Sequence, residues 1–206
     1  MKTMNKALLL TLCAVLLVAA SVMGTMAYLT AQDAVVNTFS VGSISMSLDE
    51  APVDADGKET TGDRVEANSY KLLPGHEYDK DPTIHMVATS EDAWVFVKIE
   101  NGIESYESTA DGYTNIETQI TDTYGWTELT GVEGVYYKEW HPNNALDLQV
   151  FDNFKIADNA NEIAGWADIK PESTKINVTG YAVQMDGFEN NPAGAWDVVK
   201  DAANQN

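Results

Sequence analysis

Three histidines are the residues of this sequence best suited to hold a metal ion, and they occur singly at His76, His85 and His141. The segment that begins with His76 and Glu77 resembles the start of a His-Glu-x-x-His zinc motif, but Lys80 stands where the second imidazole is needed. That motif also needs a helix, whereas this segment follows a Pro-Gly turn and precedes an expected strand. Isolated histidines on strand-rich surfaces are usually ordinary polar residues. The sequence therefore predicts no catalytic residue and no metal site, and its zinc candidates are His76, Glu77, His85 and His141.

A second pattern resembles the middle of a calcium-binding loop. It is Asp54-Ala55-Asp56-Gly57, but Pro52 stands where the first ligand should be and Asp63 replaces the terminal bidentate glutamate. Asp and Gly are also the common residues of exposed turns, so we interpret this segment as an acidic surface turn. Weak calcium binding by the acidic surface as a whole stays open as an alternative.

The composition excludes several other classes of protein. The 206 residues include 32 Asp and Glu against 12 Lys and Arg, a formal net charge of −20, which argues against nucleic acid as a partner. The single cysteine, Cys13, cannot form a disulfide within the chain. Neither a Gly-x-Ser-x-Gly elbow nor a phosphate loop nor a dinucleotide fingerprint occurs. Five tryptophans could line a carbohydrate site, but in a β-sandwich they more often pack in the core.

The N-terminal segment has the form of a signal peptide. A short basic start is followed by an uncharged apolar run, which ends with Thr25 and Ala27 at the −3 and −1 positions of a cleavage site. We expect residues 1–27 to be removed, so that the mature chain begins at Tyr28, carries a charge of −22 after losing Lys2 and Lys6, and keeps no permanent membrane anchor. An uncleaved anchor is the alternative, because 21 residues can just span a bilayer.

The rest of the chain, residues 28–206, reads as short strands between turn-rich loops. Apolar and polar residues alternate, as in half-buried strands, over 43–48, 94–100, 146–150 and 175–185. Residues 83–89 and the aromatic stretch 135–140 are further strand candidates. Residues 49–68 are acidic and rich in turn residues, so we expect an exposed loop, and 193–202 reads as a short helix. This pattern predicts an all-β fold, a single-domain jelly-roll-like β-sandwich with a short C-terminal helix.

Four segments of the sequence resemble the TasA/camelysin family. The export region 24–30 is followed by Asn-Thr-Phe-Ser-Val-Gly at 37–42, by a Pro-Gly turn within 73–80, and by a C-terminal strand within 176–188. The resemblance implies a secreted protein of a Gram-positive-type bacterium, processed by a dedicated SipW-type signal peptidase. It also implies a jelly-roll-like fold and a place in the extracellular matrix or on the cell surface, often in biofilm fibres.

The resemblance further implies an assembly mechanism. In fibre-forming members the N-terminal segment of one subunit completes the sheet of the next, so the partners are other copies or related matrix subunits. Here this strand-donation segment is 28–42, with Val35, Val36, Phe39 and Val41 as its apolar residues. Alternatively, 35–48 is simply the first strand of its own domain. Because camelysin-type members are described as metallopeptidases, a zinc peptidase is the other functional alternative, beside a monomeric cell-surface binding module.

Overall fold

The computed structural model describes residues 30–33, 44–110, 112–169 and 174–203. Its strands are β1 (Thr30–Asp33), β2 (Met46–Asp49), β3 (Glu77–Asp79), β4 (Thr83–Met86), β5 (Ala93–Asn101), β6 (Thr127–Glu128), β7 (Val135–Trp140), β8 (Asp147–Gln149), β9 (Asn153–Lys155) and β10 (Ile176–Gln184). Its helices are α2 (Ile116–Thr118), α3 (Pro192–Ala203) and four short helical turns, η1 (Glu104–Tyr106), η2 (Gln119–Thr123), η3 (Ala160–Glu162) and η4 (Trp166–Asp168). All strand pairs are antiparallel, so the prediction of an all-β fold is confirmed.

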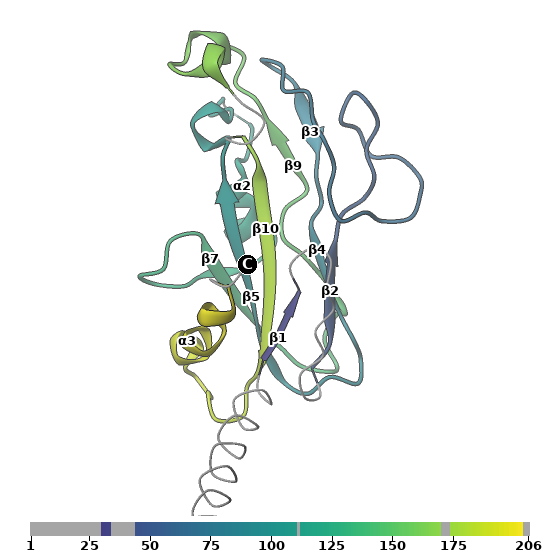
Figure 1. Ribbon diagram of the computed structural model, residues 1–206, viewed down its shortest axis with the longest axis vertical. Coiled ribbons are helices and arrows are strands. Elements are labelled where there is room, and N and C mark those ends of the chain that lie inside the picture. The colour runs from purple at the N-terminus through teal and green to yellow at the C-terminus, as the bar shows by residue number, and fades with distance from the viewer. Residues whose placement is uncertain (1–29, 34–43, 111, 170–173, 204–206) are drawn as a thin grey trace, which may run out of the picture.

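The largest sheet has the strand order β1-β10-β5-β7-β6 (Figure 1). Its central strand, β5, pairs with β10 over nine residues and with β7 over six. The side chains that point to one face of β5 are Val95, Val97 and Ile99, and all three are buried. The alternation in the sequence therefore correctly predicted β5 and β10, and the aromatic stretch over 135–140 correctly predicted β7.

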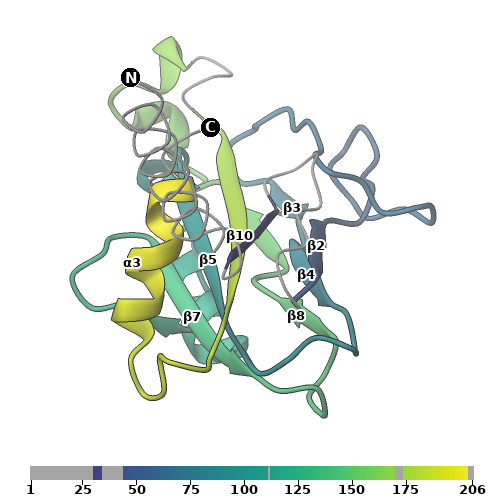
Figure 2. The same ribbon diagram turned by 60° about the horizontal axis from the view of Figure 1, so that its bottom comes forward.

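Two smaller sheets, β2-β4-β8 and β3-β9, form the layer opposite this face (Figure 2). Met46 and Leu48 of β2 are buried in the core between the layers, as the sequence predicts. Gly180 of β10 lies where side chains of β2 and β4 pack directly against the β10 backbone. A Cβ atom added there would lie 3.2 Å from Ile84 and 3.3 Å from Met46, so a glycine lets these side chains lie against the backbone.

The other face of the large sheet is covered by α3, the C-terminal helix that the sequence predicts (Figures 1 and 2). Trp94 and Phe96 of β5 are buried there beneath Trp196 and Val199. Trp94, Trp126, Trp140 and Trp196 are all buried, which confirms that most tryptophans serve packing. None of the helices in the described part of the chain is long and apolar enough to cross a membrane.

The prediction of a fully exposed loop over 49–68 is wrong in part. Asp49 ends β2, and Glu50 and Ala51 are only 3% and 6% exposed. Glu50 forms an isolated antiparallel bridge with Val65, with both backbone hydrogen bonds at 2.8 Å. The acidic composition concealed this, because Glu50 is buried through polar contacts with residues distant in sequence.

Candidate functional site

The outer edge of β10 is only partly covered by another strand. On one side, β10 pairs with β5 along its whole length. On the other side, β1 covers only residues 180–183. Among the described residues, no strand lies beside 176–179 on that side. Within the described part of the chain, 176–179 is therefore an open sheet edge, directly continuous with the β1 pairing.

The direction of the backbone groups on this edge follows from two hydrogen bonds. The N–H of Gly102 donates to the carbonyl of Lys175 at 2.9 Å, and the N–H of Met185 donates to the carbonyl of Asp92 at 2.8 Å. The odd-numbered residues of this segment therefore bond towards β5, and the even-numbered ones point away from it, because the direction alternates along an antiparallel strand. Val178 accordingly directs its N–H and C=O towards the open edge.

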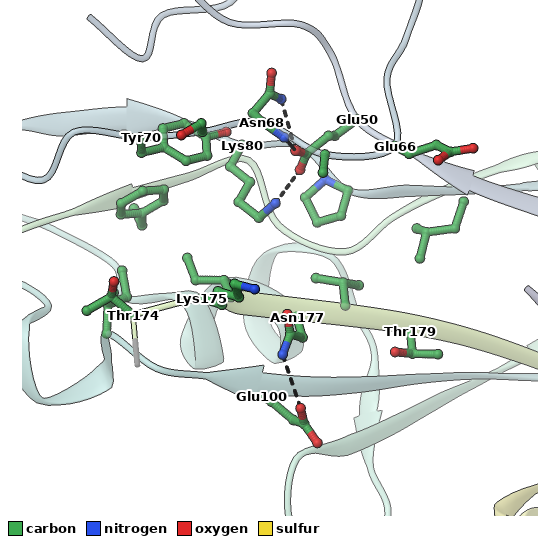
Figure 3. Close-up of a pocket in the computed structure, with 18 of the residues that line it drawn as sticks. Glu50, Glu66, Asn68, Tyr70, Lys80, Glu100, Thr174, Lys175, Asn177 and Thr179 are labelled. Carbon is green, nitrogen blue, oxygen red and sulfur yellow. Dashed lines mark hydrogen bonds and ion pairs between the residues drawn. The ribbon is translucent and has the colours of Figure 1, made fainter. Parts of the chain in front are cut away.

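A groove of about 650 Å³ runs along this edge (Figure 3). In the picture, Lys175, Asn177 and Thr179 lie on the β10 side, and Asn68, Tyr70 and Lys80 lie on the opposite side. An extended segment lying in such a groove could pair with the open backbone edge while the groove receives its side chains.

The walls of the groove are held in place by local contacts. The Tyr70 ring packs edge-on against Tyr78 and Phe154, with centroid distances of 5.7 and 5.2 Å, and its hydroxyl donates to the carbonyl of Asp79 at 2.9 Å. On the other side, Lys98 and Asn177 bond to Glu100 at 3.0 and 3.2 Å. The bond from Lys98, followed by that from Asn177, lowers the pKa of the Glu100 carboxyl.

A buried ion pair lies at the β2 side of the groove. Lys80 donates to Oε2 of Glu50, and the two side chains are 10% and 4% exposed. Oε1 of the same carboxylate accepts the backbone N–H of Asn68 at 2.7 Å and its Nδ2 at 2.9 Å. Both oxygens of the buried carboxylate are thus satisfied, which a buried charge requires.

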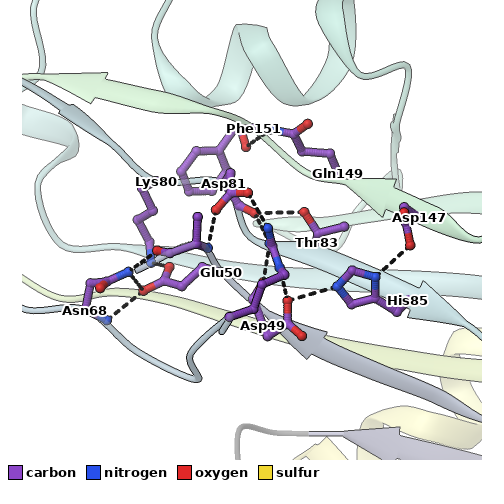
Figure 4. Close-up of polar contacts among 12 residues, drawn as sticks. Asp49, Glu50, Asn68, Lys80, Asp81, Thr83, His85, Asp147, Gln149 and Phe151 are labelled. Atoms are coloured by element: carbon purple, nitrogen blue, oxygen red, sulfur yellow. Dashed lines mark hydrogen bonds and ion pairs between the residues drawn. The ribbon is translucent and has the colours of Figure 1, made fainter. Parts of the chain in front are cut away.

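A second polar network, less buried, continues from it along β2 and β4 (Figure 4). Arg64 donates to Asp49 and, at 2.7 Å, to Asp81. The His85 ring lies between Asp49 and Asp147, with Nε2 at 2.9 Å and Nδ1 at 2.7 Å from their carboxylates. Burial lowers the pKa of His85, but the hydrogen bonds to Asp147 and Asp49 raise it more, so the net shift is upward.

These ion pairs predict a contribution to stability that is lost as the pH rises. The folded pKa of His85 lies above the unfolded value of about 6.5, so the contribution is complete below the unfolded pKa and disappears as the pH rises through the folded pKa. When the pH is raised from about 5.5 to about 8, the melting temperature of the wild type should therefore fall by more than that of the His85→Gln variant. Thermal unfolding at both pH values checks this.

The matched control is His141→Gln, because His141 contacts a single carboxylate, Asp92 at 3.1 Å, and is 42% exposed. It should keep the pH dependence of the wild type. If His85→Gln also keeps it, the ion pairs of His85 do not contribute to the stability of the folded state.

The structure does not bring the three histidines together. His76 lies in the turn before β3, where its Nε2 is 3.1 Å from the backbone oxygen of Asp56. His85 lies in β4 and His141 follows β7, each with carboxylate partners of its own. Glu77 is an exposed residue of β3, so the segment that resembles a zinc motif forms a strand, as expected, and not a helix. Among the residues that the structure describes, no group of three or more His, Cys, Asp or Glu side chains could hold a metal ion.

The remaining predicted positions have simple outcomes. The cleavage-site residues Thr25, Ala27 and Tyr28 and the apolar residues Val35, Val36, Phe39 and Val41 lie outside the described residues. The segment that resembles a calcium loop forms an exposed turn. There Oδ1 of Asp54 accepts the N–H groups of Asp56 and Lys58, both at 2.9 Å. This confirms the interpretation as a surface turn.

Sequence reasoning missed the open edge of β10 and the Glu50–Lys80–Asn68 cluster. Neither feature has a local signal in the sequence. The three side chains of the cluster, for example, come from positions separated by 12 to 30 residues. Comparison with protein-family models, with curated proteins and with solved structures finds no match to this chain.

Proposed function

We propose that this protein is a secreted structural protein of a bacterial extracellular matrix or cell surface, and that it assembles into fibres by donation of its N-terminal strand. The observation that carries the proposal is the position of β1, which belongs to the predicted donation segment 28–42 and occupies an edge of the large sheet. Because β1 covers only four residues of β10, the same edge could accept the corresponding strand of another copy.

The register of β1 specifies how such a strand would lie. Asp33 pairs with Gly180, so a donated strand that replaces β1 in this register and continues it would set Val35 opposite Val178. The strand would then satisfy the open backbone groups of β10, and its apolar side chains would enter the groove. Since each subunit donates one strand and accepts one, the contact does not close on itself and generates a filament.

The export signal fits this role. Cleavage after Ala27 by a SipW-type signal peptidase would start the chain at Tyr28, two residues before β1 begins at Thr30. The jelly-roll-like topology belongs to the proposal as well, with the first strand placed beside the last.

The acidic charge opposes assembly through mutual repulsion of the subunits, so salt, calcium ions or mild acid would favour assembly.

Negative-stain electron microscopy of residues 28–206 beside residues 43–206 tests the proposal. We expect filaments from the longer chain and none from the shorter one, which has no strand to donate. A synthetic peptide of residues 28–42 is the control, because it should bind the shorter chain and fill its β10 edge without linking two subunits. Compact particles from the longer chain, with and without calcium and at neutral and mildly acid pH, would contradict fibre formation.

A further inference from the structure

Glu50 holds an amine and a carboxamide on its two oxygens at the wall of the groove, and its own side chain is 4% exposed. Lys80 donates to one oxygen and Nδ2 of Asn68 donates to the other at 2.9 Å (Figure 3). We propose that Lys80 and Asn68 form an intramolecular isopeptide bond, with Glu50 transferring the protons. This modification is independent of the proposed fibre assembly, because all its residues belong to one chain.

The position of the two reacting groups supports the reaction. A carboxylate is a small group, so side chains bonded to its two oxygens lie side by side. Lys80 is anchored in the segment after β3, and the backbone N–H of Asn68 also bonds to Glu50 at 2.7 Å, which fixes the carboxamide relative to the carboxylate. The Lys80 amine and the Asn68 carboxamide are thus held next to each other before they react. The reaction therefore avoids the entropy cost of bringing two separate molecules together.

The carboxamide oxygen has a partner suited to the transition state. Oδ1 of Asn68 accepts the backbone N–H of Val53 at 3.1 Å, and Nδ2 also donates to the carbonyl of Ala51 at 2.8 Å. When the lysine nitrogen attacks Cγ, negative charge develops on Oδ1, where the Val53 N–H can stabilise it. These two bonds also fix which end of the carboxamide is oxygen and which is the leaving nitrogen.

The contact between Lys80 and Glu50 gives the first proton transfer a direct route. The Lys80 ammonium donates to Oε2 of Glu50, and the two side chains are 10% and 4% exposed. A proton that moves from the lysine ammonium to the carboxylate removes both charges together and leaves a neutral amine. Only the neutral amine has the lone pair that attacks a carbonyl carbon.

The reaction balances without an oxidant or other co-reactant. Glu50 takes one proton from the Lys80 ammonium, and Nζ then bonds to Cγ of Asn68 to give a tetrahedral intermediate. Protonated Glu50 returns the proton to Nδ2, the bond between Cγ and Nδ2 breaks, and the second proton of Nζ leaves with the ammonia as ammonium. The products are one amide between the two side chains and one ammonium ion, and Glu50 ends as a carboxylate.

Mass spectrometry of the purified, folded protein tests this proposal. The intact mass should be lower than the sequence mass by one ammonia molecule. After denaturation and trypsin digestion, residues 65–71 should be joined to residues 72–98, because an acylated Lys80 is not cleaved. An unshifted mass with normal cleavage after Lys80 would overturn the proposal, as would a loss of ammonia with Lys80 still cleaved, which would indicate a succinimide at Asn68.

Two variants test the assigned role of Glu50. Glu50→Gln keeps a side chain of the same size but cannot take the proton, so its folded form should show the full sequence mass. Lys58→Arg is the matched control, since Lys58 forms an exposed ion pair with Asp79 at 2.9 Å, and it should retain the mass loss of the parent chain. A complete cross-link in Glu50→Gln would overturn the role of Glu50, and the wild-type measurement decides the bond itself even if this variant does not fold.

Discussion

Replacing Val178 with proline is expected to abolish filaments while leaving the monomer folded. Val178 directs its N–H to the open edge of β10, so the substitution removes a donor that β5 does not use. The proline ring keeps an apolar group on the inner face of the strand, where Val178 packs against the core. A donated strand would lose one backbone hydrogen bond and meet the ring at the edge. Electron microscopy measures the filaments, and far-ultraviolet circular dichroism measures the fold.

Val178→Thr is the matched control, because threonine has the same shape and branching and retains the backbone N–H. It should form filaments as the wild type does. If Val178→Pro forms filaments equally well, the edge at 176–179 is not the acceptor, and strand donation in this register is excluded. If both variants lose filaments, the side chain rather than the edge is required.

The elements that the sequence predicted well are those with a local cause. β5 and β10 combine period-two alternation with β-branched and aromatic residues, and β7 is an aromatic strand that follows the turn at Gly134. The Pro74-Gly75 turn is also local, and Gly75 adopts a φ of +75°, which glycine accepts without strain. Such features need no knowledge of what lies across the core.

The candidate site has no comparable local cause. The pairing of β1 with β10 joins segments about 150 residues apart, and the pattern of one strand does not reveal which edge receives it. Glu50 lies in a stretch whose composition indicates an exposed loop, and its burial follows only from Lys80 and Asn68 arriving from other parts of the fold. Buried polar groups are satisfied by partners distant in sequence, so a single sequence does not predict them.

Replacing Trp196 with alanine is expected to lower the free energy of unfolding by about 3–5 kcal/mol. Trp196 is the largest side chain with which α3 covers the outer face of the large sheet, and it is only 5% exposed. Its ring lies 5.4 Å from Phe96 and 5.4 Å from Tyr181, between the centroids. Alanine would leave a cavity over both rings and remove most of the apolar contact between helix and sheet. Urea denaturation monitored by circular dichroism measures the change.

Trp166→Ala is the control, because Trp166 is half-buried in η4 and its ring packs against Tyr106, with 5.4 Å between the centroids. We expect it to lower the free energy of unfolding by about 1–2 kcal/mol, since less of its area leaves water on folding. A loss below about 1 kcal/mol for Trp196→Ala would mean that α3 adds little to the core. In that case β10 would be held in place by β1, β5 and the inner layer, and the stability of the large sheet would not depend on its contact with α3.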